Sequence, residues 1–253
     1  MSLVVYPALR PALEKYADVA ARAEPLRVTL HLKAGCPLAG YDPVHLDNLL
    51  AWAVLQEATA GQRLPNSSCP YALPVPLVCL WKSPDGLPLW ASSVFLPASD
   101  VVEDVEYLHK RAMSGRWSAG NEKTGRLSLD TVRGRHMERR IPVPEKLCER
   151  WEAWCWGDFT EIERLLPRVA FVGKRRAAGL GEVRAWEVTP APEMMQWTDA
   201  LHRGGTLIRP VPMDAADALG LGLSGTLALL GWTPPQWKPF CQIAAFPIGT
   251  TMP

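Results

Sequence analysis

Residues 169–188, VAFVGKRRAAGLGEVRAWEV, place a glycine-rich basic loop between two segments with the β-branched and aromatic composition of strands. Glycine tolerates positive φ and lets backbone N–H groups approach an anion closely. Such N–H groups beside three consecutive cations predict a phosphate-binding turn, with a surface hairpin carrying solvated charges as the alternative. The predicted contact residues are Gly173, Lys174, Arg175, Arg176, Gly179 and Gly181.

Two nucleotide-binding motifs that also use glycine are excluded by the residues around this loop. A Walker loop needs Ser or Thr after Gly-Lys, because the hydroxyl holds Mg²⁺, whereas Arg175 follows Lys174 here. A dinucleotide fingerprint leads from a strand into a helix, whereas this loop leads into the strand-like run Val183–Val188. Polyanion binding therefore remains the favoured function of the loop.

The composition limits the classes of protein to which the chain can belong. The chain has 253 residues, 48% hydrophobic and 21% charged, which is typical of a soluble protein of one large or two small domains. Its net charge of +1 means that any nucleic-acid surface is local. The six cysteines form no C-x-x-C pair, so we expect reduced thiols and no metal or cofactor. No apolar run is long enough for a membrane span and no signal peptide is apparent, so we expect a cytoplasmic protein without membrane contact.

The hydrophobic pattern outlines an α+β fold. Strict alternation over Leu26–Leu32 predicts a half-buried strand. Asp42-Pro43 is a helix start, followed by an apolar stripe that ends at Gly61. Helices are also expected over Val101–Met113, over Lys146–Trp156, and after a capping box at Thr160–Glu163. With the strand, loop and strand of residues 169–188, this order fits a ferredoxin-like core with an insertion.

Further binding candidates lie outside the loop. Arg27 and His31 share the polar face of the first predicted strand, and His45 lies beside Asp47 at the start of the first helix, where a capping role is the alternative. Trp186 offers a stacking surface, although aromatic side chains more often pack in the core. A strongly basic stretch completes the set, as a contact for nucleic acid or a neighbouring subunit: Arg111, Arg116, Trp117, Lys123, Arg126, Arg133, Arg135, Arg139 and Arg140.

Four features in order make the chain similar to a known family. They are the strand Leu26–Leu32, the helix start HLDNLLAW at 45–52, the stretch Gly134–Val143, and the helix from Gly157 to Leu166 followed by the loop Gly173–Val183. Across residues 26–190 the chain resembles the RAMP proteins of CRISPR effector complexes, in particular the Cas-five group subunit of type IV systems.

The resemblance implies an RNA-recognition-like, ferredoxin-like domain at residues 26–203. A basic thumb-like insertion at about 97–145 interrupts it, an extension of residues 1–25 precedes it, and a Pro/Gly-rich segment, 204–253, packs on it. It also implies a non-catalytic subunit that holds the 5′ handle of the CRISPR RNA, caps a Cascade-like complex, and contacts a backbone RAMP subunit and a large-subunit-like protein. Target DNA is a further candidate partner.

One alternative is a RAMP endoribonuclease that processes repeat RNA without a metal. Such cleavage needs a base for the 2′-hydroxyl and a cation for the phosphate, and His31 or His45 with Tyr41 and Lys33 are the candidates. A basic scaffold protein unrelated to CRISPR is the other, because fold analogy does not fix function.

Overall fold

The structure is a computed structural model that describes residues 3–40, 42–62, 64–65, 69–110 and 139–252. The helices are α1 (Arg10–Lys15), α2 (Leu46–Thr59), α4 (Phe159–Leu165) and α5 (Met213–Ala218). The strands of the first 165 residues are β1 (Glu24–Leu32), β2 (Leu38–Ala39), β3 (Cys79–Lys82), β4 (Pro88–Trp90), β5 (Leu96–Pro97), β6 (Val102–Lys110), β7 (Arg139–Leu147) and β8 (Arg150–Gly157). The later strands are β9 (Val183–Pro190), β10 (His202–Arg203), β11 (Thr206–Leu207), β12 (Val211–Pro212), β13 (Ala228–Gly231) and β14 (Gln242–Phe246).

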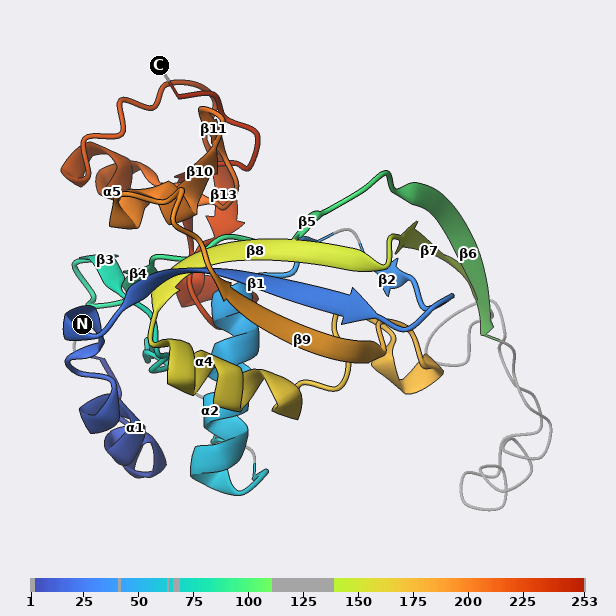
Figure 1. Ribbon diagram of the computed structural model, residues 1–253, viewed down its shortest axis with the longest axis horizontal. Helices are drawn as coiled ribbons and strands as arrows, with labels where there is room; N and C mark the ends of the chain where they lie inside the picture. The colour runs from blue at the N-terminus through green and yellow to red at the C-terminus, as the bar shows by residue number, and fades with distance from the viewer. Residues whose placement is uncertain (1–2, 41, 63, 66–68, 111–138, 253) are drawn as a thin grey trace, which may run out of the picture.

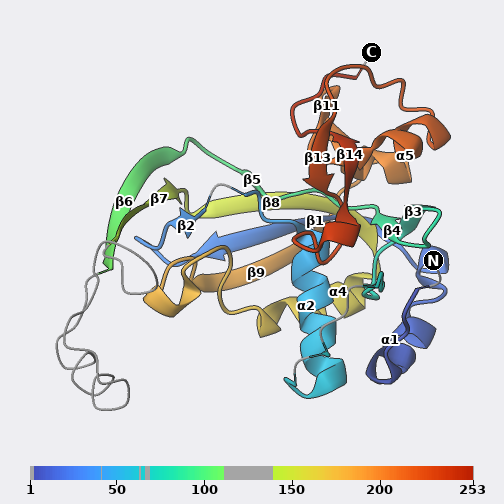
Figure 2. The same ribbon diagram turned by 180° about the vertical axis from the view of Figure 1, so that it is seen from behind.

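A four-stranded sheet forms the centre of the molecule, with strand order β5-β8-β1-β9 and every neighbouring pair antiparallel. Helices α2 and α4 cover one face, and strands β10 and β11 with helix α5 lie on the opposite side (Figures 1 and 2). The antiparallel sheets and few helices agree with the predicted α+β class.

The first strand follows its sequence pattern. Leu26, Val28, Leu30 and Leu32 are at most 1% exposed and pack in the core formed with α2 and α4. Strict alternation identified this strand because one face packs on helices and the other does not. Helix α2 begins at Leu46, later than predicted, and ends where Ala60 adopts positive φ.

Two predicted helices are wrong. The segment predicted as a helix over Val101–Met113 contains β6, which pairs with β7 in a continuous register from Val102 opposite Leu147 to Lys110 opposite Arg139. The segment Lys146–Trp156 contains β8, at the centre of the sheet. Pairing with neighbouring strands outweighs the local helix propensity of these charged segments. Strands β6 and β7 form a stem that projects from one end of the sheet (Figure 1).

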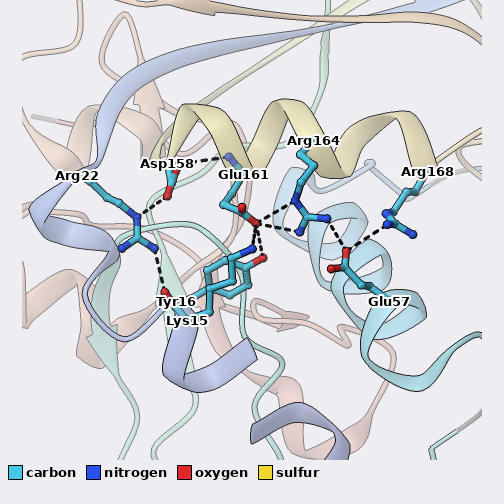
Figure 3. A network of polar contacts seen from close by, with 8 residues as sticks. All are labelled: Lys15, Tyr16, Arg22, Glu57, Asp158, Glu161, Arg164 and Arg168. Atoms are coloured by element: carbon cyan, nitrogen blue, oxygen red, sulfur yellow. Dashed lines mark hydrogen bonds and ion pairs between the residues drawn. The ribbon is translucent and has the colours of Figure 1, made fainter. Parts of the chain in front are cut away.

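The N-terminal segment is tied to helices α2 and α4 by a network of charged side chains (Figure 3). The Glu161 carboxylate accepts hydrogen bonds from Tyr16 Oη at 2.9 Å and Arg164 Nη2 at 2.9 Å, and pairs with Lys15 Nζ at 2.7 Å. Burial alone would raise the pKa of Glu161, but these three partners outweigh it and lower the pKa to about 2. Asp158 caps α4 two residues before the predicted Thr160 by accepting from the Glu161 N–H.

A buried ion pair joins the C-terminal elements to α2. Arg209 and Asp47 are both fully buried, with Arg209 Nη2 at 3.0 Å from Asp47 Oδ2. Its second terminal nitrogen, Nη1, donates to the carbonyl oxygens of Trp90 and Ser92 at 2.7 and 2.8 Å. Because each charge is buried with several partners, this pair fixes the C-terminal segment against the start of α2.

Candidate nucleic-acid interface

The glycine-rich loop is held in place at both of its ends. Val172 N donates to Gly181 O at 2.9 Å, and Gly181 N donates to Pro37 O at 3.0 Å. Gly173 and Gly181 both have positive φ, and neither position has room for a side chain. A Cβ at Gly181 would lie 2.0 Å from Val172 O, and one at Gly173 would lie 2.8 Å from Leu38 Cδ1. The glycines therefore allow a tight turn packed against β2.

Two of the three loop cations are free to bind a ligand. Lys174, Arg175 and Arg176 are all exposed, but Lys174 Nζ pairs with Asp42 Oδ2 at 2.7 Å. Arg175, at a φ of 63°, and Arg176 have no ion pair with any described residue. At the far end of the loop, Glu182 pairs with Lys33 at 3.1 Å. Both lysines are thus neutralised by an acid, so the arginines provide the uncompensated positive charge.

The backbone N–H groups of the loop also differ from one another, because one is bonded within the protein and others have no backbone acceptor. Lys174 N donates to Ala39 O at 3.0 Å, which anchors the turn to β2. The N–H groups of Arg175, Arg176 and Ala177 have no backbone acceptor among the described residues. Free N–H groups beside two unpaired guanidinium groups are a chemically suitable environment for an oxyanion. Arg184, which the sequence reasoning did not single out as a ligand, adds another exposed, unpaired cation just beyond the loop.

Arg27 and His31 lie on the sheet face that the helices leave open. His31 Nε2 is 3.4 Å from Glu187 Oε2 on the neighbouring strand β9. Arg27 lies between Trp154 of β8 and Thr189 of β9, and its buried Nε has no partner among the described residues. Since Lys33 N bonds to Glu182 O at 2.9 Å, the loop meets the end of β1 that carries His31. Arg27 is farther along the strand, about 13 Å beyond His31 at the rise of an extended chain.

His45 is enclosed by the protein. It is the N-cap residue of α2, is 8% exposed, and has Nδ1 at 4.0 Å from Asp47 Oδ1. Burial lowers the pKa of His45 to about 4, and the neighbouring Asp47 offsets only part of that effect. The imidazole is therefore neutral at pH 7 and is not presented to a ligand on the surface. It differs in this respect from Arg175 and Arg176, which are exposed.

The basic insertion is described only at its base. Arg139 and Arg140 are exposed on β7, and the Arg140 guanidinium stacks 3.8 Å from the centroid of the Tyr107 ring. The other predicted contacts of the insertion lie outside the described residues: Arg111, Arg116, Trp117, Lys123, Arg126, Arg133 and Arg135.

Trp186 does not present the stacking surface that the sequence suggested for it. That indole packs with the core on the helix side, and its Nε1 donates to Val169 O at 3.1 Å. Trp154 lies on the opposite face, where it is 7% exposed and packs with Ala191, Met194 and Ile208, with the Arg203 guanidinium 4.3 Å from its ring centroid. Alternation along β8 is the sequence pattern that places Trp154 on this face, because Trp151, Ala153 and Cys155 are buried on the other one.

Two negative findings complete the description of the site. The described part of the chain contains no group of three or more His, Cys, Asp or Glu side chains arranged to hold a metal ion. Within the same residues, no helix has both the length and the apolar character needed to cross a membrane.

The fold and the loop together define a class of α+β proteins that present an anchored basic loop at one end of an antiparallel sheet. Within that class, the model of the family described as "CRISPR type IV associated protein Csf3" matches residues 24–220. The chain therefore belongs to this family of type IV CRISPR-associated proteins. No curated protein matches the chain.

Proposed function

We propose that this chain is the RAMP subunit, of the Cas-five group, in a type IV CRISPR effector complex. The chain order β1-α2-β5-β8-α4-β9 and the strand order β5-β8-β1-β9 fit the β-α-β-β-α-β pattern of a ferredoxin-like core. The β6/β7 stem, inserted between the second and third strands of that pattern, is the base of the thumb-like insertion. The family match supports the type IV assignment.

In this proposal the subunit holds the 5′ handle of the CRISPR RNA and caps one end of a Cascade-like complex. The observation that carries it is the pair of exposed, unpaired guanidinium groups of Arg175 and Arg176 on a turn anchored at both ends. Single-stranded RNA is held by cations along its backbone. The end of β1 at His31 extends this surface, and guide pairing rather than the protein reads the target sequence.

The proposed role is non-catalytic. Of the two histidines considered for a nuclease, His45 is buried and His31 pairs with Glu187. A metal-independent nuclease needs a base positioned on the 2′-hydroxyl, and a buried neutral imidazole does not reach it. The backbone RAMP subunit and the large-subunit-like protein are the proposed protein partners, target DNA is a further one, and the complex acts in the cytoplasm.

The test is RNA binding by an Arg175→Ala, Arg176→Ala double variant. Fluorescence anisotropy with labelled repeat RNA, measured across a salt series, gives both the affinity and its salt dependence. Each lost contact to a single-stranded phosphate lowers the slope of log K against log salt by about 0.7, so the slope falls by up to about 1.4. An Arg10→Ala, Lys82→Ala variant removes two exposed cations from other elements and serves as the charge-matched control.

A double variant with the wild-type slope would exclude the loop from the RNA site. Incubation of the wild-type chain with repeat RNA in EDTA tests the enzymatic alternative. Specific scission that disappears in His31→Ala would replace the binding function with the nuclease.

A further inference from the structure

The last part of the chain has an unusual surface composition. From Leu219 to Pro253 the only charged side chain is Lys238. From Leu221 onward, this segment lies beyond residues 24–220, the part matched by the family model. Its Trp232 nevertheless packs in a small core with Leu201 and Leu207, all at most 1% exposed, so the segment is folded onto the rest of the protein.

Strand β13 is an edge strand without the usual protection. In the described residues it pairs with β14 and with no other strand, in the order β12-β14-β13. Its sequence, Ala228-Leu229-Leu230-Gly231, contains no proline and no charge, the two common means of blocking an edge. Leu229 is 72% exposed. The strand thus offers both backbone groups and an apolar side chain for pairing.

Trp237, in the loop that follows β13, is 68% exposed. Its neighbour Gln236 packs directly on β13, because a Cβ at Gly231 would lie 2.4 Å from Gln236 O. The loop is anchored by Thr233 Oγ1, which donates to Pro88 O at 2.6 Å, and by Gln236 Nε2, which donates to Asp47 Oδ1 at 3.4 Å. An aromatic side chain presented on an anchored loop loses little entropy on binding, as in interface hot spots.

We propose that the β13 edge, with Leu229 and Trp237, is a docking surface for an extended, uncharged segment of another protein subunit of the CRISPR complex. The segment adds a strand beside β13 and packs an apolar side chain between Leu229 and Trp237. A nucleic acid is the poorer occupant, because phosphates require cations and this segment has one. A second copy is also poorer: four paired residues and one indole bury far less than the roughly 1,600 Å² of a stable interface. A multi-subunit complex supplies the remaining area elsewhere.

The experiment uses the full chain, free and in a ribonucleoprotein reconstituted with CRISPR RNA and the other effector proteins encoded at its locus. Hydrogen exchange of the peptide covering residues 226–233 is expected to slow in the complex. A Leu229→Ser, Trp237→Ser double variant is expected to enter the complex at least tenfold more weakly. Met195→Ser, at a position that is 80% exposed on a different loop, is the control and is expected to assemble normally.

The proposal depends on membership of a complex and not on the RNA-handle function. The double variant is therefore expected to bind repeat RNA as the wild type does. Wild-type assembly of the double variant, or exchange at residues 226–233 that is equally fast in both states, overturns the proposal. Protection that rises with the concentration of the free chain assigns the edge to a second copy, and a loss of RNA affinity in the double variant assigns it to RNA. Either result also overturns the proposal.

Discussion

The geometry of the loop is tested by replacing two of its glycines, which share a positive φ but differ in their surroundings. Gly179 has a φ of 84° and nothing within 4 Å of the methyl group that alanine would add, whereas Gly181 has a φ of 67° and its methyl would lie 2.0 Å from Val172 O. Alanine at Gly179 costs the left-handed backbone penalty of roughly 1–2 kcal/mol, less a few tenths to 1 kcal/mol gained from the unfolded state, for a net of about 1 kcal/mol.

Alanine at Gly181 carries the same backbone penalty and an overlap well inside the 3.0 Å that real contacts respect. Relieving that overlap separates the loop from Val172 and weakens the bond from Val172 N to Gly181 O, at a further cost of about 2 kcal/mol. A total near 3 kcal/mol corresponds to a fall in Tm of roughly 6–12 °C, against about 2–4 °C for Gly179→Ala.

Thermal unfolding followed by circular dichroism measures the difference, and anisotropy with repeat RNA measures its effect on the site. Gly181→Ala is expected to weaken RNA binding more than Gly179→Ala, because it moves the turn that carries Arg175 and Arg176. Equal Tm values for the two variants would refute the described turn. A large stability difference with identical RNA affinities would retain the turn and remove it from the RNA site.

Two further predictions concern pH. His45 has a folded-state pKa of about 4 against 6.5 unfolded, so its neutral form stabilises the protein above pH 6.5, and that contribution, about 3 kcal/mol, is lost as the pH falls toward 4. The charged neighbours of His45 are Asp47, Arg209 and Asp42. A His45→Asn variant should therefore show a flatter dependence of the unfolding free energy on pH over this range, and an unchanged profile would place the imidazole in contact with solvent. Glu161 has a folded-state pKa of about 2 against 4.5 in the unfolded state, so its stabilisation of the fold is complete above pH 4.5 and is lost as the pH falls through 2. The Glu161→Gln variant should be less stable at neutral pH, and its unfolding free energy from urea titrations should fall less steeply with acid. An equally steep fall in both proteins would contradict the network.

The sequence was sufficient where a single face of an element is buried. Alternation located β1 because Leu26 to Leu32 pack on helices, and the glycines located the tight turn because the backbone there has positive φ. It failed at β6 and β8, whose strand character depends on partners far away in the chain. In β8 both faces are covered, by the helices and by the C-terminal segment around Trp154, so the spacing of Trp151 and Trp154 resembled a helical stripe.

The site residues were predictable to a smaller extent, because a residue type does not reveal its counter-ion. Lys174, Arg175 and Arg176 are equivalent in the sequence, yet Asp42 neutralises only the first. In the same way Arg27 and His31 share a strand face, but His31 faces Glu187 whereas Arg27 has no acid partner among the described residues. Such differences arise from loops and strands that are distant in the chain and adjacent in space.

The open sheet face has two unlike ends, and this asymmetry constrains how a polyanion can lie on it. At the Arg27 end, Trp154 packs with Ala191, Met194 and Ile208, so the chain that follows β9 covers that end of the face. At the His31 end, the bond between Lys33 and Glu182 joins the strand to the basic loop. Under the proposed function, a strand of RNA held by Arg175 and Arg176 would meet the sheet at His31 and would stop near Arg27. Arg27, whose Nε has no partner among the described residues, would then lie at the closed end of this path, beside the end of the RNA rather than along it.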